Sequence, residues 1–160
     1  MKEIPLTKGM VAIVDDEDFE WLSKFNWRYH KGYASRTTLL RYGKRKTVLM
    51  HREIIGNVAE QVDHIDGNRL NNTRENLRAA SRSENCRNTK SRTGSTSEYK
   101  GVSFDKGNKK WRARIKVEYK EMFLGYFNNP HDAARMYNFW AKDLFGEFAR
   151  LNIIKEEEKA

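Results

Sequence analysis

The sequence predicts an α+β protein of two modules, and three stretches of the chain support this prediction. Residues 62–88 contain the pattern of a strand, a polar loop, a second strand and a helix start. Residues 99–146 contain three strands followed by one amphipathic helix. Between them lies a polar stretch rich in Ser and Thr, which is typical of a linker. Strands and helices segregated in this way along a chain define the α+β class.

The composition favours an anionic partner. The 160 residues include 31 Lys plus Arg and 22 Asp plus Glu, a net charge of +9, and 38% of them are hydrophobic. Residues 51–85 hold 5 Lys plus Arg and 6 Asp plus Glu, whereas residues 86–120 hold 11 and 3. A positive field of this kind attracts nucleic acid, and its position predicts a binding surface that follows the central motif.

Cysteine usage and hydropathy predict a protein of a reducing compartment. Cys86 is the only cysteine, which excludes a disulfide framework and a zinc site built from cysteines. No apolar run approaches the ~20 residues that span a bilayer, and Met1 is not followed by the apolar core of a signal peptide. We therefore expect a cytoplasmic protein without a signal peptide or a membrane partner.

The first 25 residues predict a strand pair and a helix. Residues 4–14 form two short apolar runs around a turn at Lys8 and Gly9. A helix capped by Asp15 or Asp16 is expected to follow and to end near residue 25. The residues expected on its buried face are Phe19, Leu22 and Phe25.

A basic hairpin is expected next, and it completes an N-terminal antiparallel β extension. Residues 32–40 and 46–50 predict two strands joined by a turn at Tyr42 and Gly43. The polar residues of this hairpin include Arg36, Arg41, Lys44, Arg45 and Lys46. They can form an ordinary solvated face or a second surface for contact with DNA, and the sequence leaves both possibilities open.

The central stretch combines a carboxylate, an imidazole and several side-chain amides. Asp63 and His64 end a short apolar run. Ser81 and Glu84 have the spacing of a capping box, which would start a helix and place Asn85 in its first turn. Asp and Asn oxygens are hard ligands that suit magnesium or manganese. Beside such an ion, a neutral imidazole can deprotonate a water for attack on a phosphodiester. The alternative is a polar loop in which His64 makes ordinary hydrogen bonds.

This pattern resembles the motif of HNH endonucleases, in the branch whose last His is replaced by Asn. The matching residues are Asp63, His64, Asn76 and Asn85, with further similarity over residues 49–52 and 76–78. The resemblance implies a ββα-metal module in which His64 is the general base and Asn76 braces the loop. It also implies that Asp63 and Asn85 hold one divalent metal, Mg²⁺ or Mn²⁺.

The same resemblance extends to homing endonucleases of phages and introns and covers nearly the whole chain. It implies hydrolysis of duplex DNA to a 5′ phosphate and a 3′ hydroxyl, inside a bacterial or phage-infected cell. A DNA-binding regulator with an inactive HNH module is the alternative. The unbroken set of Asp63, His64 and Asn85 favours the nuclease.

The C-terminal stretch predicts a three-stranded antiparallel sheet packed on one helix. Strands are expected over residues 99–104, 110–117 and 121–127. The middle strand alternates strictly, with Ala113, Ile115 and Val117 on one face and Arg112, Arg114 and Lys116 on the other. A helix capped by Asn129 and ended by Gly146 would cover the apolar face and leave the cationic face open.

These residues resemble the DNA-binding domain of the APETALA2/ethylene-response-factor family. The matching pieces are residues 99–102, 111–115, 124–127, 133–134, 137 and 146–152. In that family the sheet lies in the major groove, and the resemblance puts five residues at or beside contacting positions: Lys100, Ser103, Arg112, Arg114 and Lys116. Ser103 stands where the plant domains usually have Arg, and Arg114 where they usually have Glu, so their base preference is not carried over.

Three more residues complete the predicted DNA-binding set. Trp111 can be a core residue or a groove contact, and Lys90 and Arg92 in the linker can follow phosphates across a duplex. Together the two resemblances imply a site-preferring, metal-dependent endonuclease that acts on double-stranded DNA, and we expect it to act as a monomer. Its expected domains are the β extension plus HNH module at 1–88, the linker at 89–98 and the APETALA2-like domain at 99–153.

Overall fold

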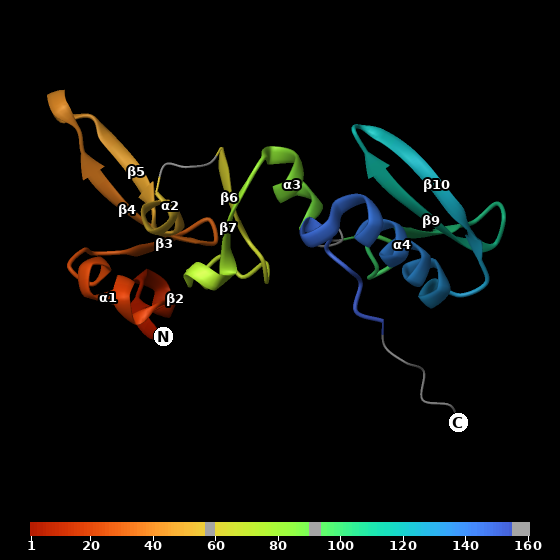
Figure 1. Cartoon of the computed structure of the whole chain (residues 1–160), viewed down its shortest axis with the longest axis horizontal. Helices are drawn as coiled ribbons and strands as arrows, with labels where there is room; N and C mark the ends of the chain where they lie inside the picture. The colour runs from red at the N-terminus through yellow and green to blue at the C-terminus, as the bar shows by residue number, and fades with distance from the viewer. Residues whose placement is uncertain (57–59, 90–93, 155–160) are drawn as a thin grey trace. The chain divides into compact units, whose positions relative to one another are not determined.

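The computed structural model describes residues 1–56, 60–89 and 94–154 (Figure 1). The chain divides into two compact units, Met1–Cys86 and Arg87–Ala160. The described residues form small antiparallel sheets and a few helices, with separate hydrophobic clusters in each unit. This arrangement confirms the α+β class.

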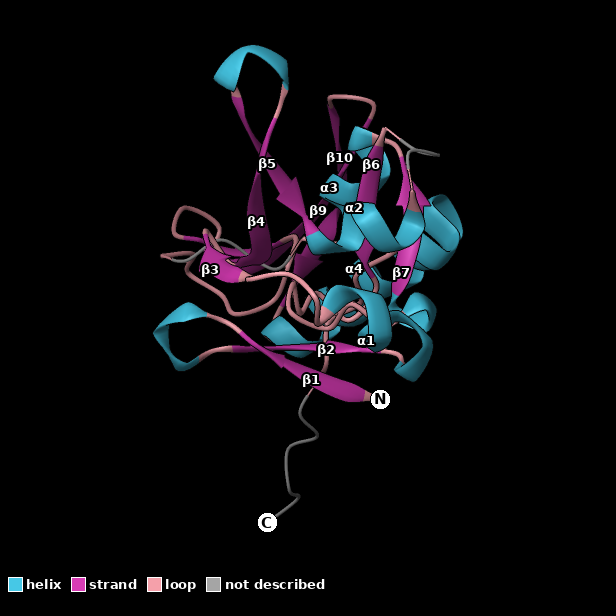
Figure 2. Ribbon diagram, turned by 90° about the vertical axis from the view of Figure 1, so that its left-hand side faces the viewer, coloured by secondary structure: helices cyan, strands magenta, loops and turns pink. Residues whose placement is uncertain are grey.

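The described residues of the first unit form three small sheets. Their strands are β1 (Lys2–Pro5) with β2 (Val11–Val14), then β3 (Arg28–His30), β4 (Tyr33–Leu39) and β5 (Arg45–Leu49), then β6 (Gln61–His64) with β7 (Leu77–Ala80). The helices are α1 (Asp16–Leu22), α2 (Met50–Ile55) and α3 (Arg82–Arg87), with 3-10 turns η1 (Thr7–Gly9), η2 (Arg41–Gly43) and η3 (Arg74–Asn76). The predicted strand pair and hairpin are confirmed, and the β4–β5 hairpin projects from the rest of its unit (Figures 1 and 2).

The first helix differs from its prediction at both ends. Asp15 occupies the N-cap position, but its side chain does not cap the helix, because Oδ2 accepts a hydrogen bond from the Arg74 backbone N–H at 2.7 Å. The helix ends at Leu22, so Phe25 does not lie on its buried face. Phe25 is instead 39% exposed, and the guanidinium carbon of Arg36 lies 4.0 Å from its ring centroid.

The second helix was absent from the sequence prediction, which extended a strand to Met50. That strand ends one residue earlier, and Met50 begins α2. Met50, His51 and Ile54 of this short helix are buried. A six-residue helix has too little periodicity to be distinguished from a strand end by its sequence pattern.

The polar loop between β6 and β7 is attached to the N-terminal extension. The backbone N–H of Ile13 donates to the Leu70 carbonyl oxygen at 2.8 Å, and the Asn72 N–H donates to the Ile13 carbonyl oxygen at 2.7 Å. The Arg74 guanidinium donates to both carboxylate oxygens of Asp18, at 2.8 Å each. Asp18 is 1% exposed, and a carboxylate buried to this degree needs a cation as partner, which Arg74 supplies.

The described residues of the second unit form an antiparallel sheet that is covered by a helix. Its strands are β8 (Val102–Asp105), β9 (Lys110–Val117) and β10 (Lys120–Phe127), in the order β10-β9-β8. The helix α4 (Pro130–Phe145) packs along one face of the sheet and leads into η4 (Gly146–Phe148) (Figure 1). The predicted cap is confirmed, because Asn129 Oδ1 accepts from the Asp132 N–H at 2.7 Å.

The first strand of this sheet starts later than predicted. Gly101 has a φ of +76°, which interrupts an extended strand, and β8 begins only at Val102. A Cβ at Gly101 would lie 2.1 Å from a ring carbon of Tyr137. Glycine is therefore required here both by the backbone conformation and by the close approach of α4.

Candidate functional site

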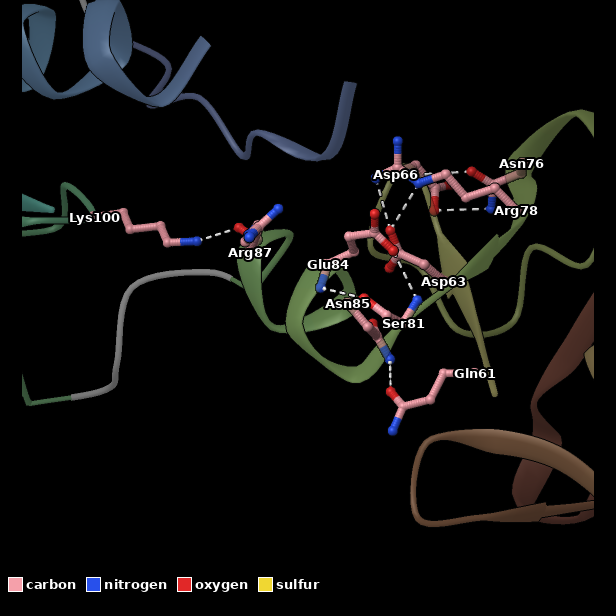
Figure 3. Close-up of polar contacts among 10 residues, drawn as sticks. All are labelled: Gln61, Asp63, Asp66, Asn76, Arg78, Ser81, Glu84, Asn85, Arg87 and Lys100. Carbon is pink, nitrogen blue, oxygen red and sulfur yellow. Dashed lines mark hydrogen bonds and ion pairs between the residues drawn. The ribbon is translucent and has the colours of Figure 1, made fainter. Parts of the chain in front are cut away.

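The β6–β7 pair presents the central acidic residue of the motif. Asp63 lies opposite Arg78 in the strand register and is 4% exposed. The guanidinium of Arg78 donates to Asp63 Oδ2 from Nη2 at 2.7 Å and from Nε at 3.0 Å (Figure 3). A buried carboxylate requires such compensation, and the pair fixes the position of Asp63 in the strand.

Asn76 holds the loop between these strands in shape. Its Nδ2 donates to Asp66 Oδ1 at 3.0 Å and to the Asn71 carbonyl oxygen at 2.8 Å, and its Oδ1 accepts from the Asp66 N–H at 3.0 Å. Burial alone would raise the pKa of Asp66, but hydrogen bonds from Asn71, the Asn68 backbone and Asn76 hold that pKa below its usual range. The three bonds of Asn76 are those of a residue that braces a loop.

His64 ends β6 and is 5% exposed. Its Nε2 lies 3.4 Å from Asn72 Oδ1, and the Asn72 amide is oriented because Nδ2 donates to the Leu70 carbonyl oxygen at 3.0 Å. Burial lowers the pKa of His64, although Asn72 and the carboxylates of Asp66 and Asp63 oppose that effect. The imidazole is therefore held in its neutral form near pH 7.

His51 is a second buried histidine beside His64, and the sequence analysis gave it no role. The ring centroids of His51 and His64 are 5.0 Å apart in an edge-on arrangement, and Tyr33 lies 5.3 Å from His51. The guanidinium carbon of Arg69 lies 4.7 Å from the Tyr33 ring centroid. Burial, followed by the neighbouring His64 and Arg52, lowers the pKa of His51 to about 3. The sequence pattern could not predict this cluster, because its residues lie far apart in the chain, on β4, α2, β6 and the loop after β6.

Asn85 lies on α3, and the capping box that starts this helix is confirmed. The Ser81 N–H donates to Glu84 Oε2 at 2.8 Å, and the Glu84 N–H donates to Ser81 Oγ at 3.3 Å. Asn85 Nδ2 donates to Gln61 Oε1 at 2.6 Å (Figure 3). Gln61 and Asp63 point to the same side of β6 because strand side chains alternate, so α3 packs on the side that carries Asp63.

The candidate residues thus occupy two sides of one strand. Asp63 and Asn85 lie on the α3 side, whereas His64 contacts Asn72, His51 and Tyr33 on the other. Within residues 1–56, 60–89 and 94–154, no group of three or more His, Cys, Asp or Glu side chains could hold a metal. A metal at this motif would rely on one carboxylate and one amide.

The open face of the C-terminal sheet carries four of the eight predicted DNA-binding residues. Ser103 lies opposite Arg112 in the β8–β9 register, and Arg114 and Lys116 follow on the same face of β9. Arg114 Nη1 donates to Glu121 Oε2 at 2.9 Å and its side chain is 40% exposed.

The other predicted DNA-binding residues are placed differently. Trp111 packs against the core on the α4 side, with its ring centroid 5.2 Å from that of Phe104. Lys100 Nζ donates to the Arg87 carbonyl oxygen, inside the second unit. Lys90 and Arg92 lie outside the described residues.

Two exposed aromatic residues on the open face were missed by the sequence analysis. Phe123 is 57% exposed and Tyr126 is 40% exposed, with ring centroids 5.0 Å apart. Strict alternation would put residues 123 and 126 on opposite faces, but a bulge at Leu124 shifts the register between Phe123 and Gly125. Each aromatic then lies opposite an arginine of β9, Phe123 by Arg114 and Tyr126 by Arg112.

Comparison with known proteins identifies the class. A sequence profile described as HNH endonuclease matches residues 48–87, which include β6, β7 and α3. The chain belongs to the HNH endonuclease family, and this membership supports nuclease activity on DNA at the level of the family.

Two viral proteins illustrate the relationship. An uncharacterised HNH endonuclease of Acanthamoeba polyphaga mimivirus is 34% identical over 155 residues, which cover 92% of this chain and 77% of that protein. Protein 3.8 of Escherichia phage T7 is 37% identical over 89 residues, which cover 56% of this chain and 73% of the phage protein. No solved structure matches the chain significantly. Among the described residues, no helix has the length and hydropathy to cross a membrane.

The depressed pKa of His51 predicts acid sensitivity of the first unit. In the unfolded chain His51 binds a proton near pH 6.5, whereas in the folded chain it does so near pH 3. The contribution of neutral His51 to the free energy of unfolding is therefore fully present above about pH 6.5 and is lost as the pH drops toward 3.

His51→Phe keeps an aromatic ring and removes the titration. Between pH 7.5 and 4.5, its free energy of unfolding in urea should therefore fall less than that of the wild type. His30→Phe is the control, because exposed His30 stays in water in both states. Equal losses in wild type and His51→Phe would contradict the prediction.

Proposed function

We propose that the protein is a metal-dependent, homing-type endonuclease that hydrolyses duplex DNA at preferred sites and acts as a monomer. The observation that carries the proposal is the arrangement of β6, its braced loop, β7 and α3 around Asp63, His64, Asn76 and Asn85. We assign this arrangement to the ββα-metal fold, with β1 to β5 as an N-terminal extension. The proposal is tested by measuring whether the protein cleaves plasmid DNA and whether changes at His64, Asp63 or Asn85 reduce that cleavage.

His64 is the general base in this proposal. Its burial favours the neutral imidazole, which is the form that accepts a proton from water. The orientation of the Asn72 amide makes Oδ1 the acceptor for Nε2–H, which selects the tautomer with its lone pair on Nδ1. Asn76 acts on the geometry alone, by holding the loop that follows His64.

Asp63 and Asn85 are the proposed ligands of one divalent metal, Mg²⁺ or Mn²⁺. A carboxylate and an amide oxygen are hard donors, which fit these ions better than zinc. Asn85 uses its amide nitrogen for Gln61, so the amide oxygen is the atom that it would offer to a metal. When bound, such an ion stabilises negative charge on the phosphoryl group and on the departing oxygen.

The two parts of the chain are proposed to divide the work. Residues 1–88 form the nuclease, and residues 89–98 are the linker that joins it to the second domain. Residues 99–153 form an APETALA2-like domain that binds the major groove through its open sheet face. The cations on that face and the exposed pair Phe123 and Tyr126 support this proposal, since a sheet fits the major groove and Arg can read guanine there. Lys90 and Arg92 remain predicted phosphate contacts.

Removal of the proposed base should abolish cleavage without loss of DNA binding. His64→Ala is expected to slow cleavage of supercoiled plasmid by on the order of 10² to 10⁴, the usual contribution of a general base. The measurement is the rate of nicked and linear product at saturating Mg²⁺, with gel-shift binding measured in parallel. A wild type that binds but never cleaves would indicate an inactive module, and full activity of His64→Ala would refute the role of His64.

Changes at the proposed metal ligands should raise the metal requirement. Asp63→Asn and Asn85→Ala are each expected to increase the Mg²⁺ concentration for half-maximal cleavage by at least about tenfold. Asp63→Asn is chosen because it keeps a hydrogen-bond acceptor for Arg78. Excess EDTA should silence the wild type, and undiminished cutting in EDTA would show that the metal assignment is wrong.

Sequence preference should depend on the open face of the second unit. Arg112→Ala combined with Arg114→Ala is expected to reduce the preference for a cleaved site over unrelated duplex by about tenfold or more, because a bidentate base contact contributes roughly 1 to 3 kcal/mol. Lys106→Ala combined with Lys109→Ala removes the same charge from the exposed β8–β9 turn and serves as the control. Gel-shift competition measures both, and an unchanged ratio in the arginine variant would assign site preference to another surface.

A further inference from the structure

A second concentration of positive charge precedes the HNH motif. From Trp21 to Arg52 the sequence holds nine Lys plus Arg and not one Asp or Glu. This charge lies in the first unit, together with the candidate catalytic residues. The sequence analysis located the positive field after the motif and left the role of the hairpin residues open.

The outer half of the β4–β5 hairpin concentrates this charge. The strands are paired from Ser35 with Leu49 to Leu39 with Arg45, and the Leu40 N–H closes the end by donating to the Lys44 carbonyl oxygen at 2.7 Å. At the base of the hairpin, Arg36 is paired with Glu53. Four further cations are exposed and have no ion pair or side-chain hydrogen bond with any described residue: Arg41, Lys44, Arg45 and Lys46.

Apolar side chains surround these cations at the tip. Tyr42 is 97% exposed and has a φ of 64°, a left-handed conformation that is unfavourable for a bulky residue. Leu39 is 72% exposed and Leu40 is 48% exposed. The hairpin extends these residues away from the rest of its unit (Figures 1 and 2), so they contribute nothing to its core.

This combination identifies the chemistry of a partner. Unpaired cations along an extended hairpin match a polyanion, and binding to phosphates would release counterions from it. An exposed aromatic ring with neighbouring aliphatic groups can stack on bases or wedge between them. A duplex offers phosphates along the hairpin and base steps at its tip.

We propose that the β4–β5 hairpin is a second DNA-contacting arm, which lies in a groove of the duplex and presses Tyr42 against a base step. The inference rests on the proposed function, since it takes duplex DNA as the substrate. It extends that function, because the nuclease part then holds its own segment of DNA independently of the C-terminal sheet.

The root of the arm sets its distance from the reaction. β4 begins at Tyr33, whose ring centroid lies 6.2 Å from that of His64, and the paired strand continues to Leu39. At about 3.3 Å per residue this strand extends ~20 Å, which corresponds to roughly six base pairs of duplex at about 3.4 Å each. With the arm lying along the duplex, its tip should therefore contact DNA about six base pairs from the phosphate that is cut.

Salt-dependent binding tests the cationic part of the arm. The probe is a fluorescein-labelled duplex of mixed sequence, titrated by anisotropy over a range of salt concentrations in Ca²⁺. A plot of log affinity against log salt has a negative slope. Arg41→Ser combined with Lys44→Ser should make that slope less steep, by about 0.9 for each phosphate that the variant no longer neutralises. Lys8→Ser combined with Lys24→Ser removes the same charge from exposed positions outside the hairpin and should leave the slope nearly unchanged. Equal slopes for the arm variant and wild type would overturn the proposal.

The tip is tested by the ring of Tyr42. Tyr42→Ala should weaken duplex binding by about five- to a hundredfold, whereas Tyr42→Phe should bind like wild type, because stacking needs the ring and not the hydroxyl. Permanganate reactivity of thymines should rise about six base pairs from the mapped cut in the wild type and in Tyr42→Phe, but not in Tyr42→Ala. Equal binding and reactivity in all three proteins would overturn the role of Tyr42.

The outcomes separate this inference from the proposed function. A wild type that binds duplex through the arm but cleaves nothing would refute the nuclease and leave the arm standing. A wild type that cleaves, with arm variants that bind like it, would refute the arm alone. Arm-dependent binding that is stronger for the matching single strand than for the duplex would overturn the duplex as partner.

Discussion

The pairing of Asp18 with Arg74 joins the N-terminal extension to the loop of the HNH motif, and the arrangement of the first unit depends on it. Asp18 is almost fully buried, receives both bonds of the Arg74 guanidinium and also accepts from Trp21 Nε1 at 3.1 Å. Loss of Arg74 would leave the buried Asp18 carboxylate without its cation. The HNH profile covers residues 48–87, yet the loop within it is fixed by contacts with residues 13–18. A segment that short buries too little apolar surface to hold its own shape.

Local rules were sufficient where a feature is set by neighbours in sequence. The capping box of Ser81 and Glu84, the Asn129 cap and the bounds of β9 are each fixed within a few residues, and each was predicted from the sequence. The same local rules did not predict the cap and the end of α1, and they did not predict α2 at all. The Asp15 carboxylate accepts from Arg74, 59 residues away, instead of capping its own helix. Such competition is invisible to a local pattern.

The candidate site shows the same limit. Asp63, His64, Asn76 and Asn85 were found because their residue types and spacing are distinctive, and the order of elements around them could be predicted. The surroundings of His64 could not, since Tyr33 and His51 reach it from β4 and α2 by packing alone. On the second unit, β9 could be assigned to its faces by alternation, while the aromatic pair of β10 was hidden by the bulge.

That bulge also determines which changes of chain length β10 can accept. With Leu124 as the extra residue, Phe123 and Tyr126 share the open face while Met122 and Phe127 face α4. Deletion of Leu124 would remove the bulge and restore simple alternation, with Phe123 and Tyr126 then two residues apart and still on the open face. Loss of that one residue is therefore a change of chain length that β10 accepts without turning either face of the sheet over.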